Sequence, residues 1–353
     1  MKIFEGNKYS FTNKKDVQCP AEKFLYRQQL GNTLSDVMHN HKSDIVSKIR
    51  EVANIHKYRR RLKGKCIEHD SLYMSLRLCF EYEINEKELA QNLLLEMFIC
   101  EGNLDTIFSI LLPGHVIKTL SSVKRYTNLL YPGFMSKTMR KKLVESFHFY
   151  LRQICETREK LTNGECDIID RPFEITELHN PLSAAAVCRD PEMVEVLLRY
   201  GANPFFRLGE ENRFDPFESL IKGLNSIFIF NNSNFNSETK DALTEEGRRG
   251  LICLDTFMRG VWSVSFDAST HINTLENGDD SDKKLEEQKS YGLNPKLADM
   301  FDYKHYMGVR SLQHVCRCSI RTTLSKNSPT LPSEIEKLPL PPSIKAYLDL
   351  KSN

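Results

Sequence analysis

Residues 180–204 read NPLSAAAVCRDPEMVEVLLRYGANP, a pattern typical of two short helices joined by a tight turn. Pro181 can start the first helix, because the first helical position needs no backbone N–H. Ala185 and Ala186 are small enough to let a second helix pack closely. Gly201 can close that second helix in the left-handed conformation that glycine adopts without strain. The stretch therefore predicts a helical hairpin whose inner face carries Val194, Leu197 and Leu198.

This hairpin resembles an ankyrin repeat, whose clearest copy in the chain spans residues 178–210. The sequence departs from the repeat at Arg189, where a turn glycine is usual, and at Ser183, where histidine is usual. These departures leave the geometry of the turn between the helices open. One repeat cannot bury its own inner face, so neighbouring repeats are required.

Two weaker copies flank the clear repeat. Downstream, Asp215-Pro216-Phe217 repeats the opening, and an Asn-rich insertion predicts a loop over 229–243 before helical spacing returns. Upstream, residues 95–114 form a degenerate copy with Gly102-Asn103 in the turn and Gly114 at the close, and with an inner face of Ile107, Ile110 and Leu111. We therefore expect a short, irregular stack of helices over residues 89–270.

Three further regions complete the expected organisation. Residues 1–88 have a mostly helical pattern that indicates no function. Residues 271–300 are rich in acidic residues, glycine and serine, which predicts a polar linker or surface loop. The basic cluster at 56–65 fits either a contact to phosphate or nuclear import, or else an ordinary solvated helix face.

The C-terminal part, residues 301–353, carries two motifs in a fixed order. Residues 311–320 read SLQHVCRCSI, so on a helix Leu312, Cys316 and Ile320 line one narrow stripe. A stripe of this kind is more often part of a protein core than a docking site. Residues 338–341 read LPLP and predict an extended apolar elbow, because two prolines so close together do not fit inside a helix.

The residues around these motifs predict three short helices. Asn327 and Pro329 end the first helix, and Ser333 and Glu336 have the spacing of a capping box for the second. Pro342 can open the third helix, whose inner face would carry Ile344, Tyr347 and Leu348.

The order of the two motifs resembles the SOCS box, whose first part binds elongin C and whose second part selects cullin 5. Together with the repeat, it makes the chain similar to the ankyrin repeat and SOCS box family, as a member with few repeats. The resemblance implies an all-α fold: a short, irregular ankyrin-repeat helical stack with a C-terminal three-helix SOCS box. It also implies an adaptor that brings an unknown protein substrate to elongin B, elongin C, and cullin 5 with its RING-box protein.

The same resemblance assigns the site residues. Elongin C would contact Ser311, Leu312, Val315, Cys316, Ser319 and Ile320. Cullin would contact Leu338, Pro339, Leu340 and Pro341. For the substrate, we expect contacts from exposed residues on the hairpin turns, namely His179, Phe206 and Arg207. The alternative is an ankyrin scaffold or inhibitor that binds elongins without assembling a ligase, which an intact LPLP motif argues against.

Composition restricts other functions. The 353 residues include 49 basic and 47 acidic ones, a balance that points to neither nucleic acid nor an anionic membrane. No apolar run is long enough to span a membrane, and residues 1–15 lack a signal-peptide core, so we expect a cytoplasmic or nuclear protein.

The residues that commonly carry chemistry are also sparse. The ten cysteines are scattered without C-x-x-C spacing, which predicts reduced thiols and no zinc site. Nothing near His39 and His41 completes a metal site. No phosphate-binding glycine loop or nucleophile motif is present. We expect no cofactor, no metal and no catalytic residue.

Overall fold

The computed structural model describes residues 45–63, 70–102, 104, 107–108, 137–161, 167–173, 180–206, 215–233, 245–261, 265–267, 290–292, 311–327 and 331–351. These residues are mostly helical, which confirms the all-α prediction. Two three-residue strands, β1 (Ser265–Asp267) and β2 (Ser290–Gly292), pair in parallel and are a minor addition. No helix in the described part of the chain is long and apolar enough to cross a membrane.

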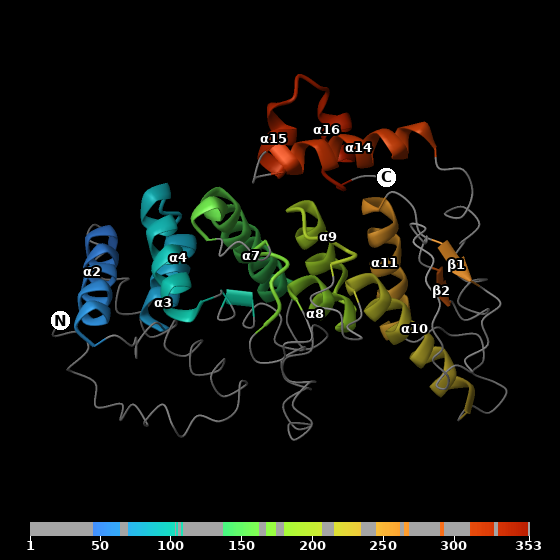
Figure 1. Ribbon diagram of the computed structural model, residues 1–353, viewed down its shortest axis with the longest axis horizontal. Helices are drawn as coiled ribbons and strands as arrows, with labels where there is room; N and C mark the ends of the chain where they lie inside the picture. The colour runs from blue at the N-terminus through green and yellow to red at the C-terminus, as the bar shows by residue number, and fades with distance from the viewer. Residues whose placement is uncertain are drawn as a thin grey trace, which may run out of the picture. The chain divides into compact units, whose positions relative to one another are not determined.

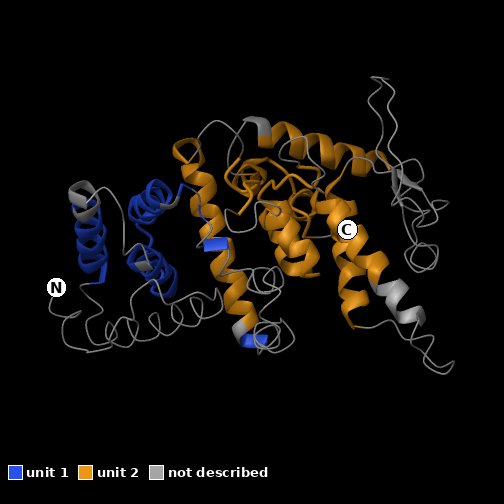
Figure 2. Cartoon of the chain, turned by 60° about the horizontal axis from the view of Figure 1, so that its bottom comes forward, with its two compact units in different colours: residues 1–139 blue, residues 140–353 orange. Residues whose placement is uncertain are grey.

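The chain divides into two compact units, residues 1–139 and residues 140–353 (Figure 2). The boundaries expected from the sequence, after residues 88, 270 and 300, do not coincide with this division. The C-terminal helices belong to the same unit as the clear repeat, because they pack directly on its helices.

Unit 1 contains α2 (Ile45–Lys63), α3 (Asp70–Glu81) and α4 (Lys87–Glu101), which pack on one another. Gly102 ends α4 with a φ of 74°, and its N–H donates to the Phe98 carbonyl at 2.8 Å, so the predicted turn glycine closes a helix. Ile107 is buried as expected, whereas Ile110, Leu111 and Gly114 lie outside the described residues. His56, the first residue of the basic cluster, is buried, so it is not part of a solvated face.

Unit 2 contains α7 (Lys137–Thr157) from Arg140 onward, followed by the 3-10 turn η4 (Arg158–Lys160). Two helix pairs come next: α8 (Pro181–Val187) with α9 (Pro191–Arg199), and α10 (Pro216–Ser233) with α11 (Glu245–Gly260). α8 packs on α10 and α9 packs on α11, so the pairs stack in sequence order (Figure 1). This arrangement is consistent with the ankyrin-like stack expected from the sequence.

The same start signal opens three of these helices: an Asn or Asp cap followed by proline. The cap oxygen accepts a hydrogen bond from the backbone N–H three residues later: Ser183 to Asn180 at 2.8 Å, Met193 to Asp190 at 3.3 Å, and Glu218 to Asp215 at 2.8 Å. The predicted opening of the downstream copy at Asp215 is therefore the start of a helix.

The turn between α8 and α9 keeps its left-handed residue although arginine stands there. Arg189 has a φ of 52°, a conformation that costs a residue with a Cβ about 1–2 kcal/mol. Its guanidinium donates to the Gly223 carbonyl at 3.3 Å and pairs with Glu246 at 3.2 Å. Its own carbonyl accepts a hydrogen bond from Arg249 at 3.1 Å. Contacts to the second helix pair thus hold the turn that the sequence left open.

Two predicted irregular segments are shorter than expected. The loop predicted over 229–243 begins later, because α10 remains helical to Ser233 despite its asparagines. The linker predicted over 271–300 contains β2, whose backbone pairs with β1 from Ser265↔Ser290 to Asp267↔Gly292. Backbone pairing does not depend on the polar composition that suggested a linker.

Gly250 of α11 faces Leu224 of α10, the other helix of the same pair. A Cβ placed on it would meet Cδ2 of Leu224 at 2.4 Å, and the Leu224 side chain is fully buried. We therefore expect Gly250→Ala to destabilise unit 2 by about 1–3 kcal/mol through overpacking. Chemical denaturation of the full chain, followed by circular dichroism, measures this change.

Gly223 of α10 supplies the matched control. It also lies inside a helix, but a Cβ there would meet only Arg189, at 3.9 Å. Gly223→Ala should therefore stabilise the chain by about 0.5–1 kcal/mol, the usual gain of alanine over glycine in a helix. Equal effects of the two substitutions would contradict the packing described here.

Candidate functional site

The C-terminal helices α14 (Leu312–Asn327), α15 (Leu331–Lys337) and α16 (Pro342–Leu348) form the three-helix arrangement expected from the sequence. Ser311 caps α14, since its hydroxyl accepts a hydrogen bond from the His314 N–H at 3.2 Å. The capping box predicted at Ser333 and Glu336 is wrong, because α15 already begins at Leu331. A small core joins the helices, formed by Leu331, Ile335 and Leu348 with partly buried Leu324, Leu338 and Leu340.

The exposed face of α14 carries the predicted stripe. Leu312 is 77% exposed, Ile320 is 36% exposed, and Cys316 between them is exposed as well. The other predicted contact residues lie beside them: Ser311 and Ser319 are exposed, and Val315 is half-buried. The structure therefore places all six residues on or beside one accessible face.

The opposite face of α14 is polar and buried, the reverse of an ordinary amphipathic helix. His314, Arg317, Cys318 and Arg321 have at most 7% of their surface exposed. A helix that only completed a core would bury its leucine and isoleucine and expose its arginines. Because α14 exposes its apolar residues and buries its arginines, the interpretation of the stripe as part of a protein core is wrong. The exposed stripe favours contact with a partner protein.

The buried arginine Arg321 bonds to two helix ends. Its Nη2 donates to the Leu198 carbonyl at the end of α9 at 2.6 Å, and its Nη1 donates to the Leu348 carbonyl of α16 at 2.8 Å. Burial lowers the pKa of Arg321 to about 10, so the guanidinium remains charged at neutral pH. Both acceptors are carbonyl oxygens at helix C-termini, which carry partial negative charge.

A second set of contacts joins α14 to α11 and α16. His314 lies 2.8 Å by its Nε2 from the carbonyl of Val261, directly after α11. The Arg317 guanidinium lies over the ring of Tyr347 in α16, 4.2 Å from its centroid. The buried face of α14 therefore attaches the C-terminal helices to the stack and to one another.

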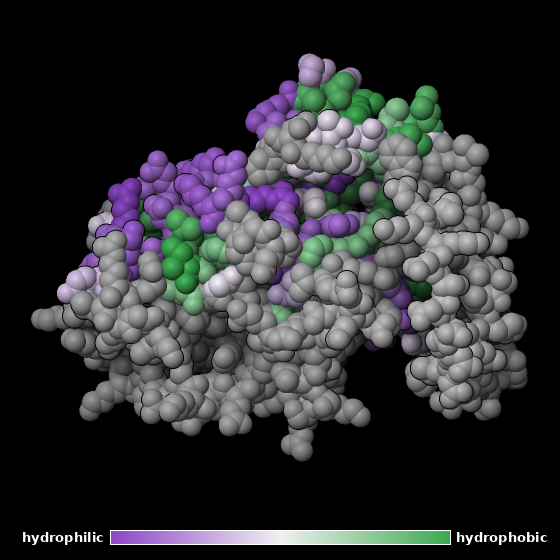
Figure 3. All heavy atoms as spheres, in the orientation of Figure 1, coloured by the Kyte–Doolittle hydropathy of each residue, from purple (hydrophilic) through white to green (hydrophobic). Residues whose placement is uncertain are grey.

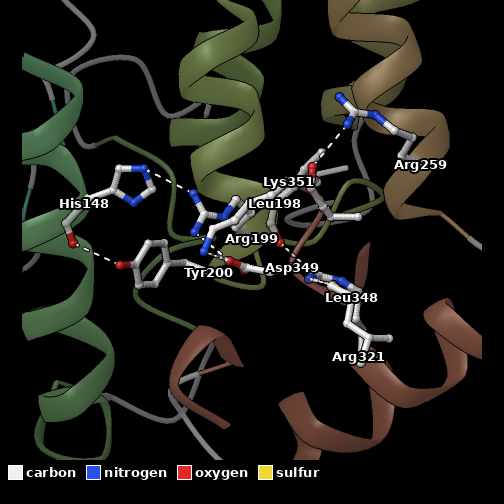
Figure 4. Close-up of polar contacts among 10 residues, drawn as sticks. His148, Leu198, Arg199, Tyr200, Arg259, Arg321, Leu348, Asp349 and Lys351 are labelled. Carbon is white, nitrogen blue, oxygen red and sulfur yellow. Dashed lines mark hydrogen bonds and ion pairs between the residues drawn. The ribbon is translucent and has the colours of Figure 1, made fainter. Parts of the chain in front are cut away.

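Arg199 at the end of α9 completes this interface (Figure 4). Its Nη2 pairs with the Asp349 carboxylate at 2.7 Å, and its Nη1 lies 3.3 Å from Nε2 of His148. Burial and the neighbouring Arg199 lower the pKa of His148 to about 4, so His148 is neutral at pH 7 and its free nitrogen accepts from Arg199. The Tyr200 hydroxyl donates to the His148 carbonyl at 3.1 Å, which ties α9 to α7.

The LPLP motif is split between the core and the surface. Leu338 and Leu340 pack against the core of the C-terminal helices, whereas Pro339 and Pro341 are exposed. Ile344, predicted on the inner face of α16, is 40% exposed instead, so that prediction is wrong. One turn further along α16, Leu348 is buried as expected. Pro339, Pro341 and Ile344 thus offer apolar surface to solvent.

Exposed apolar side chains concentrate in this region. Among the described residues, the large hydrophobic side chains classed as exposed are Tyr58, Ile99, Ile252, Leu312, Ile320 and Ile344. The last three belong to the C-terminal helices, where Figure 3 shows hydrophobic side chains gathered at the top of the view. Apolar surface clustered on a short segment is typical of a protein interaction site.

Comparison with protein families matches residues 308–349 to the SOCS box. These residues form a SOCS box. The assignment indicates that the chain binds elongins B and C and has an adaptor role in a ubiquitin ligase. Proteins with a SOCS box are typically substrate adaptors rather than enzymes. No curated protein and no solved structure matches the chain.

The predicted substrate contacts are only partly described. Phe206 is half-buried in the turn after α9, and its N–H donates to the Asn203 carbonyl at 3.3 Å. Asp170 accepts a hydrogen bond from the Asn203 N–H at 2.8 Å and so fixes the same turn. His179 and Arg207 lie outside the described residues. The predicted grouping of the three residues as a substrate site therefore stays a prediction.

Two further points concern a metal site and the interface residues that the sequence did not predict. Within the described ranges, no three His, Cys, Asp or Glu side chains are grouped to hold a metal ion. The polar contacts of Arg199, Arg259, Arg321 and Asp349 at this interface were not predicted. One signal was available: His314, Arg317, Cys318 and Arg321 recur at helical spacing opposite the apolar stripe.

Proposed function

We propose that this chain is the substrate-recognition adaptor of a cullin-5 RING ubiquitin ligase. Its SOCS box binds the elongin B and elongin C pair, and its LPLP motif selects cullin 5, which brings the RING-box protein. The observation that supports this most is the inverted helix α14, with Leu312, Cys316 and Ile320 exposed and its arginines buried.

Each residue of the stripe has a distinct expected role. Leu312, the most exposed, is the side chain that enters a pocket of elongin C. Cys316 packs where a larger side chain would not fit, and Ile320 extends the contact along the helix. Burial of a leucine side chain contributes about 1.5–3 kcal/mol, enough to make Leu312 the main anchor.

We further propose that the pairs α8–α9 and α10–α11 are ankyrin repeats that bind a protein substrate. Their proline-started helices, the left-handed Arg189 and Gly201, and the stacking of the pairs support this. From the few repeats in a longer helical body, we propose a weak similarity to ankyrin repeat and SOCS box protein 17. The substrate contacts would include Phe206, with His179 and Arg207, and the site of action is the cytoplasm or nucleus.

The proposed mechanism is positional. The adaptor holds the substrate near a ubiquitin-conjugating enzyme, which raises the effective concentration of a substrate lysine at the reactive thioester. The chemistry belongs to the partner enzymes, and the adaptor forms no covalent intermediate.

The alternative function is an ankyrin scaffold or inhibitor that binds elongins but recruits no cullin. The exposure of Pro339, Pro341 and Ile344 favours the ligase, because these side chains leave apolar surface available beside the elongin stripe. A scaffold has no need of a second apolar surface on the same segment.

Replacing Pro339 and Pro341 together by alanine separates the two functions. Both prolines are exposed, so the double variant should fold and bind elongins B and C as the wild type does. Its affinity for cullin 5 should fall by about tenfold or more, which corresponds to about 1.4 kcal/mol. Pull-down with purified elongin B, elongin C and cullin 5 measures both associations. The leucines are left intact because their loss would damage the core of the SOCS box.

Pro342→Ala is the matched control, since Pro342 is exposed and adjacent but outside the motif. It should leave cullin binding unchanged. Equal recovery of cullin 5 by the wild type and the Pro339→Ala, Pro341→Ala variant would place the cullin contact outside these prolines. Absence of cullin 5 from the elongin-bound wild type would support the scaffold function instead.

A further inference from the structure

Residues 348–351, the C-terminal turn, receive an arginine from each of three helices (Figure 4). Arg199 of α9 pairs with the Asp349 carboxylate at 2.7 Å. Arg259 of α11 donates to the Leu350 carbonyl at 3.1 Å. Arg321 of α14 donates to the Leu348 carbonyl at 2.8 Å. Two of these helices belong to the stack and one belongs to the SOCS box, so the turn lies where the two parts meet.

The turn is held by a left-handed residue, by buried side chains and by ion pairs. Leu350 has a φ of 61°, which a leucine adopts only when its surroundings impose it. Its side chain is completely buried, and its Cδ1 lies close to Gly260 at the end of α11, 3.7 Å from where a Cβ would stand. Asp349 is buried as well, and its carboxylate also binds Lys351 at 2.8 Å. Packing and charge therefore fix the same four residues.

The arginine contacts oppose movement of the SOCS box relative to the stack. A guanidinium has a rigid planar fork of donors, so Arg321 bonds to Leu198 and Leu348 only when both carbonyls lie at fixed positions. Moving the SOCS box over the stack would leave the buried Arg321 charge without the Leu198 carbonyl as acceptor, at a considerable cost in free energy. The contact between His314 and Val261, at 2.8 Å, is a second attachment that opposes rotation about the first.

We propose that the C-terminal turn is a latch that holds the SOCS box in one orientation on the stack, with Arg199, Arg259, Arg321 and Asp349 as positioning residues. The stack and the elongin-bound SOCS box then move as one rigid body. For ubiquitin transfer, a consequence that rests on the proposed ligase function, a rigid adaptor fixes which substrate lysines reach the conjugating enzyme. A loose adaptor would offer many lysines in turn.

A distance measurement on the full chain bound to elongins B and C tests the latch. Spin labels are attached to ketone-bearing amino acids at Ser226 of α10 and Glu336 of α15, both exposed, so that the native cysteines need not be changed. Pulsed electron paramagnetic resonance then measures the distribution of distances between the label on the stack and the label on the SOCS box. The wild type should give one narrow distribution. Asp349→Ala should broaden the distance distribution severalfold. Elongins should remain bound, because Asp349 lies after α16 and the elongin stripe lies on the exposed face of α14.

Lys351→Ala is the control, since Lys351 is exposed and its ion pair with the same carboxylate stays within the turn. Its distribution should stay narrow. A broad distribution in the wild type, or a narrow one in a folded Asp349→Ala variant, overturns the latch. The wild-type measurement decides the question even if Asp349→Ala does not fold. Failure of the wild type to bind elongins contradicts the proposed function instead, and the distance distribution of the free chain still tests the latch.

Discussion

Leu312→Asp should abolish binding of elongins B and C without unfolding the chain. The Leu312 side chain is 77% exposed, so the fold loses almost no contact when it is replaced. In the complex, the same change removes about 1.5–3 kcal/mol of apolar burial and places a charge in an apolar pocket. We expect the affinity to fall by about two orders of magnitude or more. Co-purification of elongins with the tagged full chain measures the loss, and thermal unfolding checks the fold.

Ile252→Asp supplies the matched control for this prediction. Ile252 is also an exposed aliphatic residue, 47% accessible, but it lies on α11 of the stack. The same change of character there should leave elongin recovery at the wild-type level. If Leu312→Asp still recovered elongins fully, or if Ile252→Asp lost them equally, α14 would not be the elongin site.

Arg321→Met should destabilise unit 2 by several kcal/mol. Methionine fills much of the volume but leaves the buried Leu348 carbonyl without its donor, whereas the Leu198 carbonyl keeps the Gly201 N–H at 3.1 Å. The unpaired carbonyl costs about 1–3 kcal/mol, and the loss of two hydrogen bonds from a charged group adds to this. Chemical denaturation of the full chain measures the shift of the unfolding midpoint.

Arg317→Met provides the comparison for Arg321. Arg317 contacts the Tyr347 ring at 4.2 Å and His314 at 3.1 Å. Among the described residues, no backbone carbonyl accepts a hydrogen bond from it. Its replacement should cost clearly less than that of Arg321. Equal midpoints for Arg321→Met and the wild type would show that the buried arginine does not hold the SOCS box to the stack.

Local signals predicted much of the fold. As predicted, Pro181 starts α8, the Asp215-Pro216-Phe217 opening starts α10, and Gly201 closes α9 with a φ of 92°. These features depend on neighbours within a few residues, which a sequence pattern records. Arg189 is different, because its left-handed turn is held by Gly223 and Glu246 from the next helix pair. Nothing within the turn itself indicates that support.

The candidate site also contains residues that local sequence signals predicted and residues that they did not. The stripe Leu312, Cys316 and Ile320 follows from helical periodicity alone. The buried role of Arg321 does not, because arginines are usually exposed and its acceptors lie 123 and 27 residues away in sequence. The inward Leu338 and outward Ile344 likewise depend on how the three short helices meet, which short motifs do not specify.

Titration of the purified full-length chain with the elongin B and elongin C heterodimer tests the central claim most directly. Isothermal calorimetry should show saturable binding of one heterodimer per chain, with a negative change in heat capacity as the apolar stripe on α14 becomes buried. The same titration with the Leu312→Asp variant should show no binding. Absence of binding by the folded wild-type chain, or unchanged binding by Leu312→Asp, would contradict the account.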